Sequence, residues 1–399
     1  MILKTNFSFI KLFIGTITFL IFSNFIIYQI FILKIPQFIL LGLIFSIIIA
    51  YKVLKKETIK FQLSGLLIWT FYYFILVSFS FILTDPDDTT FGLYKKFFVS
   101  LFALWTTYII YKYDDYELLT TRRTILYTMI FSTFLVIFDF INPGFFISEE
   151  SDRYVAGRAA AMFLNPNIAG TALIISLILS IDIVHKKWRS LIIFFVFIGV
   201  ALTFSRASIL AYVVITFILM LQRKIEAKKI LLAVLILMIS FSVFLTAGIS
   251  FLEKKGINTD NILGRITFFQ TAGQEIRDYS YYERKMILEK ALNMFAENPL
   301  TGSGFGATRT WDVDVSAHNL YAVHWAEYGI FGMIILPLLL FLLYWKAKGQ
   351  IKNVIFLFII FILFRSIFTH NTLDSYYILA SISIIMLLNL KSRKINDKK

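Results

Sequence analysis

Apolar runs about as long as a membrane is thick recur along almost the whole chain. A helix needs roughly 20 apolar residues to cross a bilayer. About twelve segments approach that length: 9–33, 37–54, 61–83, 92–111, 124–142, 167–184, 190–204, 207–222, 230–251, 320–345, 352–368 and 373–390. Only 16% of the residues are charged, against about 25% in soluble domains. The sequence therefore predicts an all-α polytopic membrane protein.

Lysine and arginine are concentrated in every second connection between these runs. The basic connections carry Lys52, Lys55, Lys56, Lys60, Lys112, Arg122, Arg123, Lys186, Lys187, Arg189, Arg223, Lys224, Lys228, Lys229, Lys346, Lys348, Lys352 and the tail from Lys391. The alternate connections include the acidic residues 85–88 and residues 369–372, which contain no Lys or Arg. Because basic residues mark cytoplasmic loops, we expect both termini in the cytoplasm. Lys95 and Lys96 depart from this rule, since they lie near the far side.

This topology divides the chain into three parts. Residues 1–251 form an N-terminal bundle of about nine helices, residues 252–319 form a large loop on the far side, and residues 320–399 form the C-terminal helices and a cytoplasmic tail. Residues 281–298 within the loop have an amphipathic helical pattern with too many charges to span a membrane. We expect this helix to lie on the membrane surface or to pack over the bundle.

The composition excludes several classes of function. The chain has no cysteine and only four histidines, so disulfides, thiolate sites and a histidine-rich metal site are not expected. No glycine fingerprint for nucleotides is present. The net charge of +14 comes from short loops between apolar runs, where it sets topology, so nucleic acid is not an expected partner. We expect neither a metal nor another cofactor.

Several arginines lie at the far face of the predicted bundle. Arg206 follows an apolar run in the segment 203–208, where a guanidinium is costly unless it meets a cavity or a partner. It could bind a phosphate in bidentate fashion, or it could be a snorkelling or topology residue. Its place on the outer side argues against the topology role. Arg284, on the loop helix, taken alone fits a solvated charge better than a ligand, and Arg265 and Arg158 are weaker candidates.

His318 lies where the large loop re-enters the membrane, next to Asn319. A single histidine is often structural, but its ordinary pKa suits proton transfer near neutral pH. His324 is six residues on, roughly 240° around a helix, so the two should not share a face. Glu327 could be a buried partner or a second functional group. Arginines with a histidine at a membrane face indicate a phosphate-bearing lipid substrate, whose diphosphate leaves once its charge is stabilised.

Four sequence blocks in this order resemble the bacterial O-antigen ligase and polymerase family, over roughly residues 155–335. The blocks are Arg158 with Phe163-Leu164-Asn165-Pro166-Asn167; Thr203-Phe204-Ser205-Arg206-Ala207-Ser208; Arg284 with Ala291-Leu292 and Pro299-Leu300-Thr301-Gly302-Ser303-Gly304; and Ala317-His318-Asn319-Leu320-Tyr321 with Glu327-Tyr328-Gly329-Ile330-Phe331-Gly332. The family usually has an aromatic residue shortly after the loop arginine, and residues 286–288 depart from that pattern.

The resemblance implies a metal-independent, inverting glycosyltransferase in the bacterial inner membrane, acting at its periplasmic face. The donor would be an undecaprenyl-diphosphate-linked glycan. The acceptor would be lipid A-core for a ligase or a second lipid-linked glycan for a polymerase. Arg206 and Arg284 would hold the diphosphate, and His318 would activate or position the acceptor hydroxyl. Further substrate-binding residues would be Arg265, Arg158, Asn319 and Glu327.

Two other classes of protein remain open. A transporter or flippase of lipid-linked glycans would also have about twelve helices and cytoplasmic termini. Transporters, however, tend to have matching halves and polar sites at the midplane, whereas these candidates collect at one face. A non-catalytic membrane protein of envelope synthesis would tolerate replacement of Arg206 and His318. The sequence does not separate ligase from polymerase.

Overall fold

The structure is a computed structural model that describes residues 2–33, 65–84, 87–114, 118–148, 157–226, 279–311 and 317–396, together with 151, 154, 155 and 228. Its α-helices are α1 (Ile2–Phe22), α2 (Phe25–Leu33), α4 (Gly65–Leu83), α5 (Asp88–Tyr111), α6 (Leu119–Ile141), α7 (Pro166–Ser180), α8 (Lys186–Leu202), α9 (Arg206–Leu221), α13 (Tyr279–Glu297), α14 (Leu320–Tyr344), α15 (Gly349–Phe368) and α16 (Tyr376–Asn396). Short 3-10 helices are η1 (Ala161–Phe163), η2 (Ile181–Ile183) and η4 (Asn371–Leu373). The described residues contain no strand, so the all-α prediction is confirmed for them.

Five described helices are long and apolar enough to cross a membrane: α4, α6, α7 with η2, α14 and α15. The bent pair α1 and α2, with 61° between its arms, would make a sixth span. Helices α5, α8, α9 and α16 occupy further predicted positions but are shorter or more polar. The predicted runs 37–54 and 230–251, and most of the predicted loop 252–319, lie outside the described residues. The apolar helices support a membrane protein.

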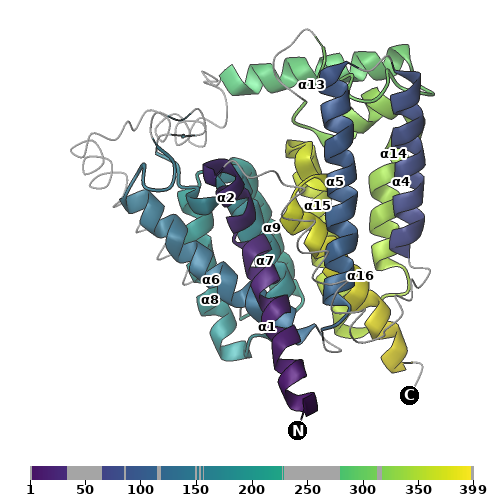
Figure 1. Cartoon of the computed structure of the whole chain (residues 1–399). Coiled ribbons are helices and arrows are strands. Elements are labelled where there is room, and N and C mark those ends of the chain that lie inside the picture. The colour runs from purple at the N-terminus through teal and green to yellow at the C-terminus, as the bar shows by residue number, and fades with distance from the viewer. Residues whose placement is uncertain are drawn as a thin grey trace. The chain divides into compact units, whose positions relative to one another are not determined.

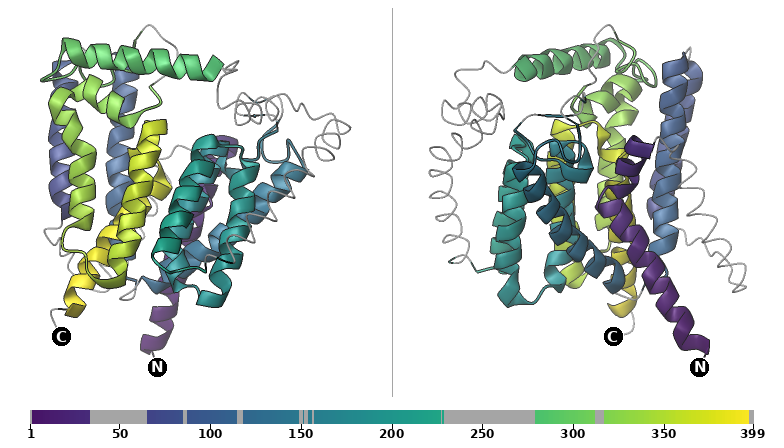
Figure 2. Two further views of the ribbon diagram at one scale, coloured as in Figure 1. Left: turned by 180° about the vertical axis from the view of Figure 1, so that it is seen from behind. Right: turned by 60° about the vertical axis from the view of Figure 1, so that its left-hand side comes forward.

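The chain folds as two compact units, which we describe separately. Unit 1 comprises Met1–Ile14, Leu33–Leu119 and Ser280–Lys399. In it, α5 packs against α16, and α4 packs against α14, where the indole nitrogen of Trp69 donates to the Ile335 carbonyl at 2.8 Å. Helix α13 lies crosswise over one end of α4, α5 and α14, and α16 ends at the opposite end of this unit (Figures 1 and 2). The helix predicted over 281–298 is thus present as α13, and it packs over the bundle.

Unit 2 comprises Gly15–Ile32 and Thr120–Tyr279. Its central helix is α7, which packs against α8 and α9 and is buried along almost its whole length. The break between α1 and α2 falls at Asn24, whose side-chain amide donates to the Met162 carbonyl at 3.1 Å. This buried hydrogen bond ties the bent pair to the segment that leads into α7.

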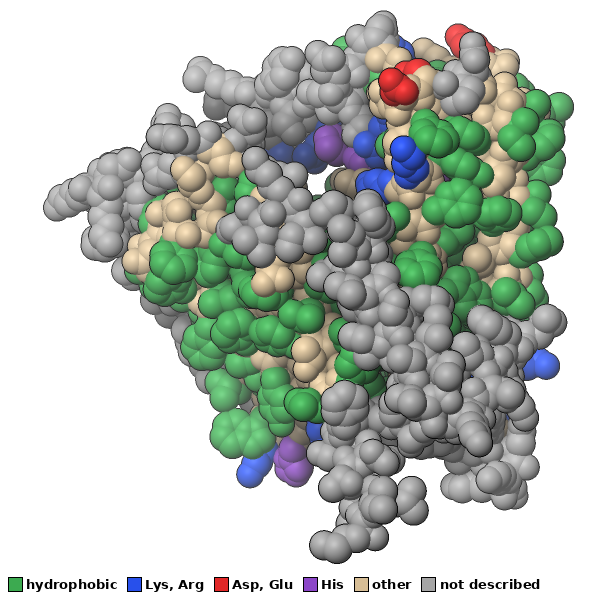
Figure 3. Space-filling model, viewed as in Figure 1, with side chains coloured by type: hydrophobic (Ala, Val, Ile, Leu, Met, Phe, Trp, Pro, Cys, Tyr) green, Lys and Arg blue, Asp and Glu red, His purple; other side chains and the backbone are tan. Residues whose placement is uncertain are grey.

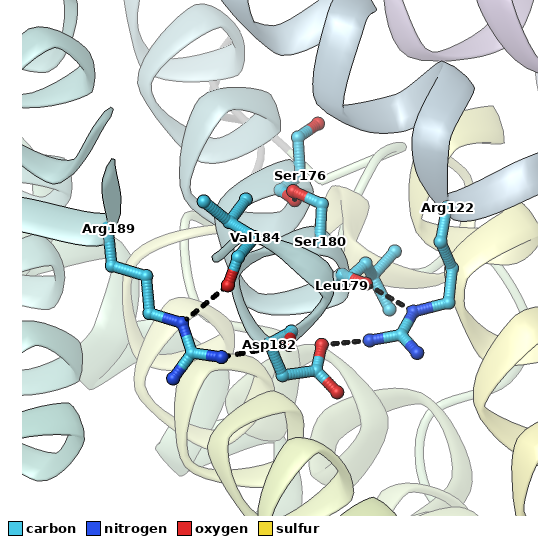
Figure 4. A network of polar contacts seen from close by, with 7 residues as sticks. All are labelled: Arg122, Ser176, Leu179, Ser180, Asp182, Val184 and Arg189. Atoms are coloured by element: carbon cyan, nitrogen blue, oxygen red, sulfur yellow. Dashed lines mark hydrogen bonds and ion pairs between the residues drawn. The ribbon is translucent and has the colours of Figure 1, made fainter. Parts of the chain in front are cut away.

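Two arginines from the predicted cytoplasmic connections satisfy the carbonyl end of α7 (Figure 4). Arg122 donates to the Leu179 carbonyl at 2.8 Å and pairs with the Asp182 carboxylate. Arg189 donates to the carbonyls of Val184 at 2.9 Å and of Asp182 at 3.0 Å. The last carbonyls of a helix lack partners within the helix and carry its negative dipole end, so cations are favoured there. Both arginines therefore have a structural role at this end of unit 2.

Candidate functional site

Two of the four motif blocks meet in unit 2. Arg158 donates from Nε to the Thr203 carbonyl at 2.9 Å and from a terminal nitrogen to the Asn167 side-chain oxygen at 3.0 Å. It therefore bridges the first turn of α7 and the junction that leads into α9. Arg206 is the first residue of α9 and is half-buried.

The starts of α7 and α9 form as their sequences predict. Asn165 caps α7 by accepting from the Asn167 amide at 2.8 Å, and Pro166 follows at the first helical position. Ser205 caps α9 by accepting from the Ser208 amide at 3.4 Å. These asparagine and serine side chains satisfy amides that have no partner within their helices, so they act as structural members of the motifs.

A pocket in unit 2 lies beside Arg158. Asp139, Phe140, Tyr154 and Pro166 are among the residues that line it. One carboxylate oxygen of Asp139 accepts from the amides of Ala160 and Ala161, both at 2.8 Å. Asp139 therefore fixes the segment directly after Arg158. Sequence reasoning missed Asp139, although an acidic residue inside the apolar run 124–142 was a visible signal.

The other two motif blocks meet in unit 1, where α14 is broken at Gly329. This residue has φ +60° and ψ −143°, a conformation that glycine adopts without steric cost. The break frees backbone groups of α14, and the glycine turn after α13 pairs with them. The Ser303 amide donates to the Ala326 carbonyl at 2.7 Å, and the Ile330 amide donates to the Pro299 carbonyl at 2.9 Å. The turn is therefore held against α14, although its composition predicts flexibility.

Glu327 reinforces this junction. It is only 5% exposed, and its carboxylate accepts from the Thr308 hydroxyl at 2.5 Å. A buried carboxylate is stable only when hydrogen bonds or charges compensate it, and these contacts lie within the protein. Of the two roles open to Glu327, the buried partner is the one that its contacts favour.

Helix α13 is anchored beside the start of α14. Ala291 packs against Ala322 and Ala326, and Ile287 packs against Ala317 and Val323. Trp311, from the segment that follows the glycine turn, contacts both clusters. This packing brings Arg284 of α13 close enough to His318 to act on its titration.

His318 lies in the segment before α14 and is half-buried. Burial lowers the pKa of His318 from its usual value, and the positive charges of Arg284 and Arg309 lower it further. The imidazole is therefore neutral at pH 7 and can accept a proton. The structure thus brings together two residues that the sequence singled out, His318 and Arg284, and adds Arg309.

The residue after His318 caps the helix that follows. The side-chain oxygen of Asn319 accepts from the amides of Tyr321 at 3.0 Å and Ala322 at 3.1 Å. His324 lies elsewhere, buried against the rings of Tyr73 and Tyr328 at centroid distances of 6.0 and 5.9 Å. Arg265 lies outside the described residues.

The site contains three residues that sequence reasoning did not assign to it. His370, between α15 and η4, has its ring 5.9 Å from the ring of His318. Arg309 follows the glycine turn, and Lys96 of α5 forms an ion pair with Asp374 at 2.8 Å. The sequence marks two of them as unusual. Lys96 is a basic residue near the far side, where basic residues are not expected, and His370 is in a loop without Lys or Arg.

These residues form a basic patch at one end of unit 1, which we call the histidine–arginine cluster: His318, His370, Arg284, Arg309 and Lys96. Histidine and basic side chains gather near the upper end of α5, beneath α13 (Figure 3). Such a cluster can bind an anion and move a proton. Among the described residues, no three His, Asp or Glu side chains are grouped to hold a metal ion.

Comparison with known proteins agrees with this chemistry. Residues 191–337 match the family model for O-antigen ligase, and no curated protein matches the chain. The matched segment begins in α8 and ends in α14, so it contains Arg206, Arg284 and His318. It indicates a glycosyltransferase activity of the ligase or polymerase type on lipid-linked glycans. This match, together with the apolar helices, supports the O-antigen ligase and polymerase family for the segment 191–337.

Proposed function

We propose that this protein transfers an oligo- or polysaccharide from an undecaprenyl-diphosphate donor to a sugar hydroxyl, at the periplasmic face of the bacterial inner membrane. The acceptor is lipid A-core if the protein is a ligase, or a second lipid-linked glycan if it is a polymerase. The observation that carries the proposal is the position of His318, a half-buried imidazole beside the guanidinium groups of Arg284 and Arg309.

The guanidinium groups suit the donor. A diphosphate leaves a sugar carbon readily when its developing charge is stabilised, and arginine forks match phosphate oxygens in pairs. Arg284 is exposed and Arg309 is half-exposed, so both can reach a ligand. Arg206, in unit 2, is a further candidate for donor binding because its motif resembles that of the family. Arg158 holds the junction before Arg206, and we assign it and Arg265 to substrate binding at second rank.

His318 suits the acceptor. Its neutral imidazole takes the proton from the attacking hydroxyl, and a bond forms between the hydroxyl oxygen and the anomeric carbon of the donor. The bond from that carbon to the diphosphate breaks, and the electron pair leaves with the diphosphate. Attack opposite the leaving group inverts the anomeric configuration. The arginines supply the charge stabilisation, so no metal is required.

The arrangement of unit 1 supports the proposed face. Helix α13 and the end of α16 lie at opposite ends of this unit (Figure 1). The tail after α16 is rich in lysine, which favours the cytoplasm. The histidine–arginine cluster is then expected on the periplasmic side, where assembled lipid-linked glycans are presented.

The deciding experiment uses the purified full-length protein with an undecaprenyl-diphosphate-linked oligosaccharide. Lipid A-core and a second lipid-linked repeat are offered separately, and release of undecaprenyl diphosphate and product length are measured. Transfer to lipid A-core alone identifies a ligase, and a growing ladder on the carrier identifies a polymerase. No turnover with either acceptor, in folded protein, contradicts the proposal and favours transport.

A matched pair of variants separates site chemistry from general charge. Arg284→Ala removes the guanidinium beside His318, whereas Lys285→Ala removes the next positive charge, which pairs with Glu289 at 3.8 Å on the solvent face of α13. We expect Arg284→Ala to lose most transfer and Lys285→Ala to retain it. Equal activity of the two variants would remove Arg284 from the site.

A further inference from the structure

The pocket in unit 2 contains a carboxylate that the proposed mechanism does not use. Asp139 lies in the last turn of α6 and is half-buried, and it lines this pocket together with Phe140, Tyr154 and Arg158. An acid is unfavourable at the carbonyl end of a helix, where the helix dipole is negative. Asp139 therefore needs compensating partners, either within the protein or in a ligand.

The protein supplies partners for only one oxygen of this carboxylate. Oδ2 of Asp139 accepts from the amides of Ala160 and Ala161, both at 2.8 Å. Among the described residues, no donor bonds Oδ1 and no cation forms an ion pair with Asp139, although Arg158 lines the same pocket. Oδ1 is thus left for a donor that enters the pocket.

The chemistry of the pocket walls selects the class of ligand. A carboxylate accepts hydrogen bonds but donates none, it repels a phosphate, and it is costly to cover with a lipid chain. The rings of Phe140 and Tyr154 have faces with a partial negative charge, which attract weakly positive C–H groups. A sugar ring has hydroxyl donors at its edge and C–H groups on its faces. A neutral sugar therefore fits this pocket better than a phosphate or a lipid chain does.

Two contacts join the pocket to the start of α9. Arg158 donates to the Thr203 carbonyl at 2.9 Å, and the ring of Phe140 lies 6.3 Å from the ring of Phe204. Thr203 and Phe204 lie three and two positions before Arg206, the candidate ligand of the donor diphosphate. A sugar in the pocket would therefore lie beside the junction that leads to Arg206, which favours the sugar next to the diphosphate.

The backbone around the pocket is held in an unusual conformation. Ala161, Leu164 and Phe204 have φ of +48°, +61° and +47°, a region that residues with side chains rarely adopt. The hydrogen bond from the Ala161 amide to Asp139 holds the first of these residues. Such strain is common at binding sites, where the surrounding structure fixes the shape of the site in advance. Asp139 therefore shapes the pocket with one oxygen and offers the other to its ligand.

We propose that this pocket binds the sugar of the donor glycan that is attached to the diphosphate, and that Oδ1 of Asp139 accepts from a hydroxyl of that sugar. This inference rests on the proposed function. Asp139 then helps to determine which sugar is accepted. A sugar whose hydroxyl meets the carboxylate is bound, whereas a sugar without it leaves the carboxylate oxygen unpaired.

The substitution Asp139→Asn separates ligand binding from the structural role. It keeps an oxygen that can accept from the amides of Ala160 and Ala161, and it replaces the other oxygen with an amide group that donates. The probe is the oligosaccharide released from the donor by mild acid, which contains neither lipid nor diphosphate. We expect the full-length wild type to bind this probe, and the Asn variant to bind it about 10–100-fold more weakly with a nearly unchanged melting temperature.

Glu226→Gln is the matched control, because it makes the same chemical change at an exposed carboxylate beyond the other end of α9. It should leave the affinity for the probe unchanged. Equal affinity of the wild type and Asp139→Asn would overturn the proposal, as would failure of the wild type to bind the probe.

A second variant decides if Asp139→Asn fails to fold. Phe140→Leu removes an aromatic face from the pocket but keeps an apolar wall. We expect it to bind the probe about 2–10-fold more weakly than the wild type does. Unchanged affinity in this variant would overturn the proposal.

Kinetics distinguish this inference from the proposed function. In the transfer reaction, Asp139→Asn should raise the donor KM by about 10–100-fold, while kcat stays close to that of the wild type. An unchanged donor KM in a variant that transfers would overturn the sugar site alone. Absence of transfer by a wild type that binds the probe would instead contradict only the proposed function.

Discussion

The glycine turn after α13 offers a sharp test of how the site is held together. Gly302 has φ +73°, and a Cβ atom added there would lie 2.4 Å from the Glu327 carbonyl carbon and 2.4 Å from the Tyr328 nitrogen. These are backbone atoms, so no side-chain movement relieves the clash. Gly302→Ala must therefore push the turn away from the break in α14.

The expected cost follows from two terms. The left-handed conformation costs a residue with a side chain about 1–2 kcal/mol. Displacing well-packed neighbours costs about 1–3 kcal/mol more. We therefore expect Gly302→Ala to destabilise unit 1 by about 2–5 kcal/mol, and to reduce transfer because the turn carries Thr308 and Arg309.

The assay is the apparent melting temperature of the purified full-length protein in detergent, with transfer activity measured beside it. Gly92→Ala is the control, since Gly92 lies inside α5 and has nothing within 4 Å of an added Cβ. That change should be stabilising by about 0.5–1 kcal/mol. A Gly302→Ala protein that melts and turns over like the wild type would refute the role of the turn.

Four further outcomes are expected of the site. His318→Ala should lower kcat by about 10²–10⁴-fold in folded protein, and normal glycan output would remove its role. The acid limb of the pH–rate profile should have its midpoint below 6.5, because only neutral His318 is active and because burial and two arginines lower the pKa of His318. Arg284→Ala removes one of these positive charges and should therefore raise the midpoint. A downward shift of the midpoint in that variant would contradict the assignment. Arg206→Lys should weaken donor binding, because an ammonium lacks the fork of a guanidinium. Wild-type donor affinity in this variant would exclude Arg206 from the donor site. Activity should persist in a chelator, and a strict requirement for a divalent ion would count against charge stabilisation by arginine.

Features that depend on neighbouring residues could be predicted from the sequence. Asn165-Pro166 and Ser205 begin their helices as expected, because a cap needs only the amides two or three positions along the chain. The helix α13 is predicted by its spacing of apolar residues, and it ends at Glu297, directly before Asn298-Pro299. Membrane-spanning runs could be recognised from length and hydropathy.

Features that depend on distant contacts could not be predicted from the sequence. The break at Gly329 exists because the turn at 299–304 supplies partners for the freed backbone groups, and no local pattern shows that pairing. The sequence leaves two roles open for Glu327 because its partner, Thr308, is 19 positions away. It does not indicate His370 because α14 and α15 separate this residue from His318 in the chain.

The structure explains why each motif alone is weak and the set is specific. Asn319, Glu327 and Gly329 have contacts within the protein, and they build the frame around α14. Caps, buried acids and left-handed glycines occur in many folds, so such residues identify nothing by themselves. In the proposed mechanism His318 and Arg284 act together because this frame brings α13 to the start of α14. Substitutions in the frame should therefore lower both stability and rate, whereas substitutions of His318 and Arg284 should lower the rate alone, and melting temperatures measured beside kcat will separate the two groups.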